Sequence, residues 1–418
     1  MTNLSALVID SPTPIVVGGL TLTERAILLA HRVGFAPIRV LSVRGLAPTS
    51  LSLLQARGIS IVELPSKSPL RALPPDEHIT LLGPNVLFGA TALTALAAEA
   101  KAIDTSAALV VREAGVPLLV FLPAQTAAGL EACRSIEEIV ANRARQGVLR
   151  ETDLPGQFYR RVDGTASASR AEREYVRYLN GGEHESFFTK IIRRFSVPLS
   201  SRLVRLGAGP TQVTIGGLGL ALASAACLAH GSYLTGLLGA ALYYTSMIFD
   251  CSDGEVARLT VRDSATGAWL ETVVDYVTYF LVLGALVIAV NGRPGADGYR
   301  VAALIAVTGS IVVAAVASYL RHRVAAADPG QFDDSSAMAL ASATPVHRFA
   351  RWGRQWIKRS TMAHLIVALA LVNQLPVLLY LWAFGATVAA VVILIVEPFV
   401  ARRVAVRLVT VRNRSAGG

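Results

Sequence analysis

Hydrophobic residues are spaced differently in the two halves of the chain, and the change falls near residue 205. In the first half, apolar runs of strand length alternate with segments in which apolar residues recur every three or four positions. In the second half, the apolar runs are long enough to cross a bilayer as helices, at about 1.5 Å of rise per residue. The pattern therefore predicts an N-terminal α/β domain followed by a helical membrane domain.

The first half predicts a sheet of mostly parallel strands. A helical segment at 20–34 opens with Thr21 and Glu24 at the spacing of a capping box. Strands and helices that alternate in this way are typical of βαβ units, in which successive strands run parallel. We assign residues 1–150 to this domain, with strand-like segments at 5–10, 36–43, 78–83, 107–113 and 117–123 and a second helix at 90–102.

Between the two halves the chain becomes polar and then basic. Residues 151–185 are rich in charged residues, Gly and Ser, and predict a linker with one short helix. Residues 186–208 mix Phe, Ile and Leu with Lys and Arg, which is typical of an amphipathic helix on an anionic membrane surface. Within it, Arg193 and Arg194 serve either this contact with lipid headgroups or the binding of a substrate phosphate.

The second half predicts six membrane spans in a domain at 209–403, followed by a basic tail at 404–418. Lys and Arg gather before the first span, between spans two and three, between spans four and five, and after the sixth, whereas the opposite loops hold only Arg293 and Arg300. By the positive-inside rule, both termini are expected in the cytoplasm of a multi-pass inner-membrane protein. The predicted spans lie near 212–229, 235–259, 266–291, 298–322, 360–375 and 377–401.

Composition supports a membrane protein over a nucleic-acid-binding one. Hydrophobic residues make up 53% of the chain and charged residues 16%, and the formal net charge is +10. The excess positive charge flanks the apolar segments, so we interpret it as topology and expect no nucleic acid partner. The scattered Cys133, Cys227 and Cys251 indicate neither a disulfide framework nor a zinc site. The first residues lack a basic flank and a long apolar core, which argues against a secretory signal.

Four carboxylates lie at the edge of two long apolar runs. Asp250 and Asp253 are spaced i, i+3 and Glu271 and Asp275 are spaced i, i+4, so each pair lies on one helix face. Acidic groups in or beside a membrane are costly unless they are paired, hydrated or bound to a cation, so their gathering predicts a functional site. Oxygen ligands of this kind suit Mg²⁺ or Mn²⁺.

The spacing of this acidic motif resembles that of the CDP-alcohol phosphotransferases, membrane enzymes that make phospholipids and related phosphodiesters. Every gap of the family motif matches, and one residue departs from it, because Glu271 stands where the family has Asp. The extra methylene of Glu271 moves its carboxylate oxygens by about a bond length, to which metal geometry is sensitive. The matching positions are Asp250, Asp253, Gly254, Ala257, Arg258, Gly267, Glu271 and Asp275.

The resemblance implies roles for these residues. Asp250, Asp253, Glu271 and Asp275 would hold two Mg²⁺ or Mn²⁺ ions, and Asp275 would also be the base for the acceptor hydroxyl. A homodimer is expected, since family members are often dimeric. At the end of the fourth span, Arg321 and Arg323 would hold an acceptor phosphate or only set orientation. The residues expected to bind the CDP moiety are Asp250, Asp253, Gly254, Ala257, Arg258 and Gly267.

The first domain is similar to the sugar-phosphate nucleotidyltransferases. The segment GGLTLTERAILLAHRVGFAPIRVL carries this likeness, and a domain of that kind precedes the membrane part of bifunctional inositol-phosphate cytidylyltransferase/di-inositol-phosphate phosphate synthases. Residues 209–214 also resemble the TPNQVT sequence ahead of the first span of those synthases. The phosphate-binding Gly-rich loop and the metal-binding Gly-Asp pair are missing, and 82–85 reads Leu-Gly-Pro-Asn. We therefore expect a degenerate, nucleotidyltransferase-like domain without catalysis.

The expected function is transfer of a phosphoalcohol from a CDP-alcohol to a polar or phosphorylated alcohol, with release of CMP and with an inositol phosphate as the suggested acceptor. One alternative is a CDP-diacylglycerol-dependent phospholipid synthase with another polar acceptor. An alternative of a different class is a divalent-cation transporter that uses the same carboxylates. A third is a pseudoenzyme in which Glu271 spoils the metal site.

Overall fold

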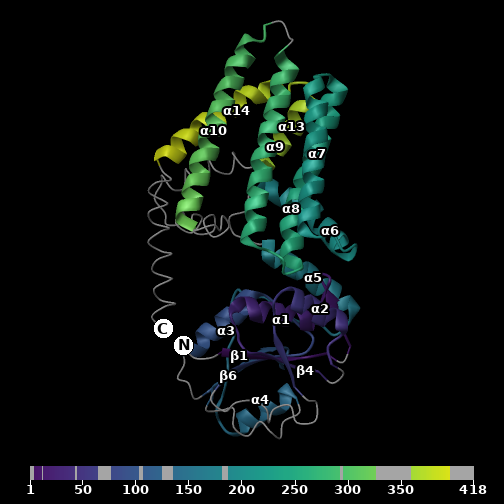
Figure 1. Cartoon of the computed structure of the whole chain (residues 1–418), viewed down its shortest axis with the longest axis vertical. Helices are drawn as coiled ribbons and strands as arrows, with labels where there is room; N and C mark the ends of the chain where they lie inside the picture. Colours follow the sequence, from purple (N-terminus) through teal and green to yellow (C-terminus); the bar gives the residue numbers. More distant parts are fainter. Residues whose placement is uncertain are drawn as a thin grey trace. The chain divides into compact units, whose positions relative to one another are not determined.

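The computed structural model describes residues 4–11, 13–42, 45–64, 77–102, 107–124, 135–180, 187–291, 295–325 and 359–395. The chain divides into two compact units, which are considered separately below (Figure 1). The first unit comprises Met1–Asn180 with Leu259–Val261, and the second comprises Gly181–Arg258 with Arg262–Gly418.

A seven-stranded sheet forms the centre of the first unit, in the order β10-β8-β9-β6-β1-β4-β5. β1 pairs in parallel with β4 and β6, β4 with β5, and β8 with β10. β9 runs antiparallel to both of its neighbours, β6 and β8. Two small ladders lie outside this sheet and pair β2 Val16–Val17 with β3 Leu20–Thr21, and β7 Val86–Phe88 with β11 Tyr159–Arg161. The strands of the sheet itself are β1 Leu4–Ile9, β4 Ile38–Leu41, β5 Ile61–Leu64, β6 His78–Leu82, β8 Ala108–Glu113, β9 Val116–Leu122 and β10 Leu149–Glu151.

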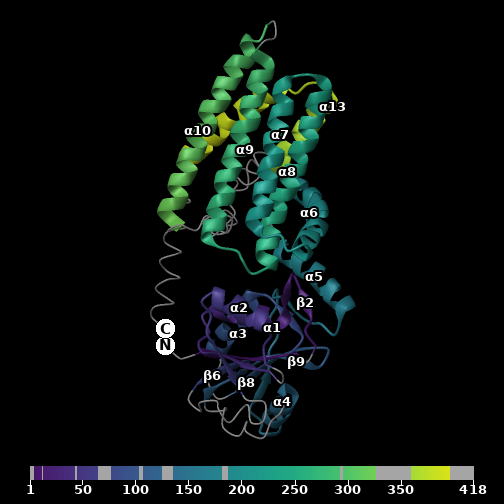
Figure 2. The same ribbon diagram turned by 45° about the vertical axis from the view of Figure 1, so that its right-hand side comes forward.

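Alternating side chains of the strands build one hydrophobic core on each face of the sheet. Ala6 and Val8 of β1 belong to a core that α1, α2 and α3 complete, whereas Leu7 belongs to a second core completed by α4. Figures 1 and 2 show α1, α2 and α3 on one face of the sheet and α4 on the other. The helices of this unit are α1 Leu22–Val33, α2 Pro48–Ala56, α3 Ala90–Ala102, α4 Ile136–Arg145 and α5 Thr165–Asn180.

The structure confirms the α/β character of the first domain and its mostly parallel sheet. The predicted capping box is present, since the Thr21 side chain accepts the Glu24 N–H and the Glu24 carboxylate accepts the Thr21 N–H. The antiparallel direction of β9 follows from a tight turn after β8, in which Ala114 and Gly115 both have positive φ, of 50° and 81°. The segment predicted as a linker contains β11 and α5, and the first unit extends to Asn180.

The connection from β1 to α1 contains the short β2–β3 ladder. Asp10, which follows β1, accepts hydrogen bonds from Thr23 Oγ1 at 2.6 Å and from Ser42 Oγ at 2.7 Å. These bonds connect β1 with the first turn of α1 and with the end of β4. The contacts of Asp10 are therefore those of a structural residue.

Helices make up the described part of the second unit. A single core runs through it and joins Ile192 of α6 to residues of the long helices. Figures 1 and 2 show α9 between α7 and α10, with the three helices lying lengthwise next to one another. The helices are α6 Phe187–Arg205, α7 Pro210–His230, α8 Tyr233–Leu259, α9 Ala265–Asn291, α10 Asp297–Ala325, α13 Arg359–Leu371 and α14 Val377–Ile395.

Three helices of the described chain are long and apolar enough to cross a membrane, namely Pro210–His230, Ala265–Asn291 and the Asp297–Tyr319 part of α10. α13 and the Val377–Val391 part of α14 are shorter apolar helices. The six predicted spans fall on α7, α8, α9, α10, α13 and α14. A helical domain with membrane helices is thus supported, and the number six stays a prediction. The predicted basic tail at 404–418 lies outside the described residues.

An ion pair between Arg39 of β4 and Glu77, just before β6, makes the stability of the first unit depend on pH. The guanidinium donates two hydrogen bonds to the carboxylate, at 2.7 and 3.3 Å, and the side chains are only 9% and 16% exposed. The hydrogen bond from Arg39 lowers the pKa of Glu77 below its ordinary value of 4.5. The folded form therefore binds the Glu77 proton more weakly than the unfolded chain does. The ion pair stabilises the folded unit above about pH 4.5, and this contribution is lost as the pH falls through the lower pKa of the folded state.

We predict that Glu77→Gln lowers the free energy of unfolding of the first unit by about 2 kcal/mol at neutral pH. The variant should also lose part of the acid dependence, because Gln carries no titrating group. Hydrogen exchange of the β1 and β4 amides across this pH range would measure both effects. Glu99→Gln, at an exposed position of α3, is the matched control and should leave exchange unchanged; equal behaviour of the two variants would contradict the prediction.

Candidate functional site

The four predicted carboxylates lie where α8 ends and α9 begins. Asp250 and Asp253 come from the last turns of α8, and Glu271 and Asp275 come from the first turns of α9. A short connection joins the helices, and Val261 within it adopts a positive φ of 52°. Because the connection between the two helices is short, Asp250 and Asp275, which are 25 positions apart in the sequence, lie in one region of the second unit.

Asp253 is the most buried of the four, with 4% of its surface exposed. Its Oδ2 accepts a hydrogen bond from Thr214 Oγ1 of α7 at 2.7 Å, and its Oδ1 accepts the Gly254 N–H at 2.6 Å. Its charge also interacts with those of Asp250 and Glu271. Three negative groups therefore share one region, and such an arrangement needs positive charge or hydrogen-bond donors to be stable.

Arg359, the first residue of α13, supplies positive charge to this region. Its Nη1 lies 2.8 Å from Asp250 Oδ1 and also forms an ion pair with Asp275. The guanidinium carbon lies 5.9 Å from the centre of the Tyr279 ring, within the range of a cation–π contact. One cation thus links the carboxylate of α8 with that of α9, and its side chain is only 10% exposed.

The small residues of the motif have visible packing roles. A Cβ atom added to Gly254 would lie 3.3 Å from Arg258 Nη1, so the glycine leaves room for the Arg258 guanidinium. Gly267 lies in the first turn of α9, where its N–H donates to Ser264 Oγ at 3.1 Å and caps the helix. Ala257 is half-buried one turn beyond Asp253.

The basic residues predicted to hold an acceptor phosphate have different positions. Arg193 of α6 forms an ion pair with Glu255 of α8, at 3.1 Å. Arg194, its neighbour, is exposed. Arg321 and Arg323 belong to the last turns of α10, and their side chains lie outside the described part of the structure. The structure therefore brings Asp250, Asp253, Glu271 and Asp275 into one region and pairs Arg193 with a residue outside the predicted set.

The chemistry of these side chains fits a divalent cation. All four donors are carboxylates, and the position between Asp250 and Asp275 already accepts a cationic group, the guanidinium of Arg359. Among the described residues, no three His, Cys, Asp or Glu side chains are close enough together to hold a metal ion. Arg359 occupies the position between Asp250 and Asp275, so a Mg²⁺ or Mn²⁺ ion bound to these two carboxylates would compete with its guanidinium.

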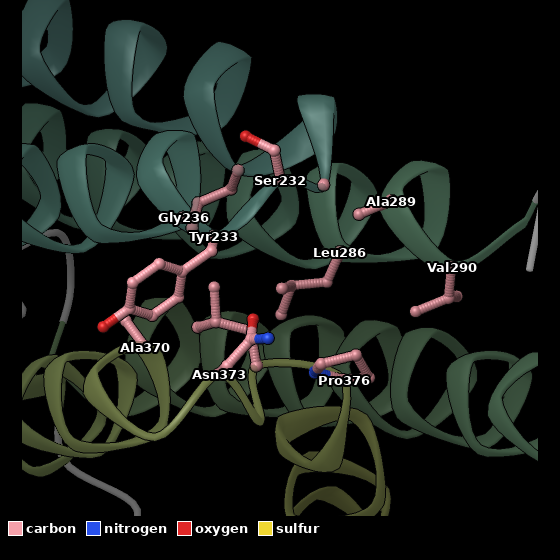
Figure 3. A pocket seen from close by; sticks show the side chains of 12 residues that line it. Ser232, Tyr233, Gly236, Leu286, Ala289, Val290, Ala370, Asn373 and Pro376 are labelled. Carbon is pink, nitrogen blue, oxygen red and sulfur yellow. The ribbon is translucent and has the colours of Figure 1, made fainter.

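A small cavity lies at the opposite ends of the same helices (Figure 3). It has a volume of about 20 Å³, enough for a water molecule, and lies between the start of α8, the end of α9 and the α13–α14 turn. Gly236 at this cavity lies seventeen positions before Asp253 in α8, which corresponds to about 25 Å along a helix. The cavity is therefore separate from the carboxylate site. Figure 3 shows Ser232, Tyr233, Gly236, Leu286, Asn373 and Pro376 around it.

Comparison with known proteins gives relatives of one kind. The chain is 31% identical over 147 residues to the bifunctional IPC transferase and DIPP synthase of Aquifex aeolicus, a match that covers 35% of this chain and 33% of the relative. The protein of the same name from Thermococcus kodakarensis is 30% identical over 180 residues, covering 43% and 39% of the two chains. The archaetidylinositol phosphate synthase of Methanothermobacter thermautotrophicus is 35% identical over 97 residues, covering 23% and 46%.

The chain is related to these synthases. This relationship confirms the resemblance to bifunctional inositol-phosphate synthases that the motif and the first domain indicated. The matches span only 31% to 39% of the bifunctional relatives. No protein-family model matches the chain. A crystal structure of phosphatidylinositol phosphate synthase from Mycobacterium tuberculosis with manganese and citrate covers 48% of this chain and 87% of its own, at 23% identity and a TM-score of 0.33, which is too low for a conclusion about this chain.

Two residues of the site were missed from the sequence. From the sequence, Arg359 is one of the basic residues between spans four and five, which predict orientation only, although an arginine at the very start of an apolar segment can turn toward the helix ends beside it. Glu255 lies inside the motif at a position that the family pattern leaves open, so the pattern assigned it no role. A third carboxylate in the same two turns of α8, beside Asp250 and Asp253, is a signal that could have found it.

We predict that Thr214→Val destabilises the site, because it leaves Asp253 Oδ2 buried without its hydroxyl donor. The expected loss is about 1 to 3 kcal/mol of unfolding free energy. Thr214→Ser keeps the hydroxyl and is the control. Thermal unfolding in detergent should rank wild type and Thr214→Ser above Thr214→Val, and identical midpoints for the two variants would show that the hydrogen bond has no role.

We predict that Arg359→Gln increases the affinity for Mn²⁺ by about tenfold, equivalent to about 1.4 kcal/mol. The physical reason is that Arg359 and a divalent ion compete for Asp250 and Asp275. Arg359→Lys retains a positive charge and should stay closer to wild type. Titration with Mn²⁺ followed by electron paramagnetic resonance would measure the affinity; weaker binding in Arg359→Gln would mean that Arg359 supports the ion and does not compete with it.

Proposed function

We propose that this chain is a CDP-alcohol phosphotransferase that moves a phosphoalcohol from a CDP-alcohol to an acceptor hydroxyl and releases CMP. The observation that carries the proposal is the convergence of Asp250, Asp253, Glu271 and Asp275 at the facing ends of α8 and α9. Their spacing matches the motif of that family, and relatives named as synthases of inositol phosphodiesters support the same reaction.

The reaction needs the negative charge of a pyrophosphate to be neutralised and a hydroxyl to be activated. The acceptor oxygen forms a bond to the phosphorus that carries the alcohol, and the bond from that phosphorus to the CMP oxygen breaks. Divalent ions, when bound, neutralise the pyrophosphate and the leaving CMP. Asp275, which is 32% exposed, takes the proton of the acceptor hydroxyl.

Other residues position the donor. Thr214 and the Gly254 N–H fix the orientation of the Asp253 carboxylate. Gly254 and Ala257 are small, which suits close passage of the cytidine along this turn. Arg258 lies over Gly254 and can reach the donor phosphates from there. The CDP moiety would therefore lie along the last turns of α8 and the start of α9 at Gly267.

An inositol phosphate is the acceptor that the relatives favour. The relatives are named bifunctional IPC transferase and DIPP synthase and archaetidylinositol phosphate synthase. In the first unit, the β2–β3 ladder takes the place of a phosphate-binding loop, so we assign that unit a structural role without nucleotidyl transfer. Arg193, Arg194, Arg321 and Arg323 remain the candidates for acceptor phosphate binding.

Six spans with both termini in the cytoplasm complete the proposal. Apolar side chains of α6 are exposed beside basic ones, with Phe187 at 71% and Phe195 at 52% exposure. This pattern supports a helix that lies on the anionic membrane surface, with the carboxylate site on the cytoplasmic side of an inner membrane, where CDP-linked donors are found. A homodimer is the proposed assembly.

The experiment is CMP release by the purified protein in detergent with Mg²⁺ or Mn²⁺. CDP-diacylglycerol and CDP-inositol are offered separately as donors, each with inositol phosphate as acceptor. We predict metal-dependent CMP release that Asp275→Asn lowers by at least about a hundredfold, since the variant loses the base and one metal ligand. Asp263→Asn, in the loop between the same helices, is the control and should retain activity.

The donor and acceptor that give turnover decide between the proposed reaction and phospholipid synthesis with another polar alcohol. Absence of CMP release with any donor would contradict the proposal. Activity that appears only in Glu271→Asp would instead identify the chain as a pseudoenzyme, whereas metal flux in proteoliposomes without CMP release would identify a transporter.

A further inference from the structure

Glu255 is a fully buried carboxylate that the proposed reaction does not use. Its side chain has no exposed surface. Oε1 accepts hydrogen bonds from Ser196 Oγ at 2.8 Å and from Arg193 Nη1 at 3.1 Å, and Oε2 accepts one from Ser200 Oγ at 2.6 Å. All three donors come from one stripe of α6, at positions i, i+3 and i+7. One carboxylate of α8 is thus enclosed by a single neighbouring helix.

Glu255 and Asp253 lie on opposite sides of the same helical turn. Successive residues of an α-helix are rotated by about 100°, so a separation of two positions places the side chains about 160° apart. Asp250 and Asp253 face the carboxylate site, whereas Glu255 and Ser252 face α6, where Ser252 Oγ lies 3.5 Å from the Ser196 carbonyl oxygen. Any rotation of the end of α8 that moves Glu255 therefore moves the two aspartates as well.

The same helix α6 also contacts α13 at its first turn. Thr189 Oγ1 lies 2.9 Å from Ser360 Oγ, and the rings of Phe188 and His364 are 4.8 Å apart. His364 is itself oriented, because Nδ1 donates to the Ser360 carbonyl at 2.7 Å and Nε2 lies 3.2 Å from the Tyr244 hydroxyl. Ser360 follows Arg359, so α6 contacts both the helix that carries Asp250 and the helix that carries its counter-charge.

A buried carboxylate is a costly way to join two helices. Apolar side chains of similar volume hold helices together at least as well, whereas hydrogen bonds of fixed direction define rotation and register. Ser196, Ser200 and Ser252 are small and buried, which lets α6 and α8 approach closely around the carboxylate. The arrangement is therefore suited to fixing the angle at which α8 presents its aspartates.

We propose that Glu255 is a positioning residue and that α6, through it, sets the geometry of the carboxylate site. The inference rests on the proposed function for its catalytic consequence. Displacements of about 1 Å at a reacting centre lower rates by up to about a hundredfold without changing the contacts that bind substrate. Loss of the Glu255 contacts therefore acts on turnover, whereas the binding of the CDP donor is retained.

The test compares Glu255→Gln and Ser200→Ala with Ser201→Ala, the neighbouring serine of α6 that makes no contact with Glu255 among the described hydrogen bonds. Each full-length variant is assayed for CMP release with varied donor, and hydrogen exchange of the α6 amides is measured in the same detergent. For Glu255→Gln we expect kcat to fall by about ten- to a hundredfold, KM for the donor to change by less than about twofold, and α6 exchange to accelerate by at least about tenfold. Ser200→Ala should show a smaller effect in the same directions, and Ser201→Ala none.

Unchanged kcat in both Glu255→Gln and Ser200→Ala would overturn the proposal, as would a rise of KM with kcat preserved. If Glu255→Gln does not yield folded protein, Ser200→Ala decides alone, because it removes one hydroxyl and leaves the charge paired with Arg193. If wild type releases no CMP, the proposed function fails by itself. In that case, hydrogen exchange of the α6 amides decides on the role of Glu255. Equal exchange in Glu255→Gln and wild type would overturn that role, and faster exchange in the variant would support it.

Discussion

Negative charge gathers where α8 ends and α9 begins, and the rest of the second unit has to stabilise it. Carboxylates that approach one another in surroundings of low polarity repel strongly, and each also loses hydration. In the described structure, side chains of three other helices offset this cost with hydrogen bonds and positive charge. Thr214 of α7 donates to Asp253, Arg359 of α13 pairs with Asp250 and Asp275, and α6 encloses Glu255. The bundle is organised around these polar contacts as much as around its apolar core.

This arrangement separates two kinds of acidic residue in one stretch of α8. Asp250 and Asp253 face a region where a cation is held, so their charge is available for chemistry. Glu255 faces α6 and accepts hydrogen bonds from three of its side chains, so its charge serves the fold. Both kinds lie within two turns of one helix, and residue type alone does not distinguish them.

Local patterns predicted much of the structure. The capping box at Thr21, the alternation of strands and helices and the two acidic pairs depend on neighbours in sequence, and each could be predicted from spacing. The direction of β9 depends on a two-residue turn at Ala114 and Gly115, which lacks the usual Asn-Gly signal. Arg359 contacts Asp250, 109 positions away in the sequence, and Glu255 contacts Ser196, 59 positions away. Contacts between residues so far apart cannot be predicted from the periodicity of the sequence. The metal, donor and acceptor roles of the site stay predictions.

The first unit is stabilised by packing on both faces of its sheet and by polar contacts at the ends of its strands. Its sheet has a core on each face, and Asp10 is used in hydrogen bonds that join β1 to α1 and β4. The β2–β3 ladder between β1 and α1 takes part in one of these cores through Leu20.

The contacts of α6 with the first turn of α13 have a consequence for how sequences of this kind can diverge. Arg359 is held in place through space, by Thr189 and Phe188 acting on Ser360 and His364. Thr189 and Ser360 are 171 positions apart in the sequence, so the position of the positive charge beside Asp250 depends on a helix far from it along the chain. A substitution at Thr189 would therefore alter the surroundings of Asp250 without touching either carboxylate helix, and we expect α6 and the start of α13 to diverge together.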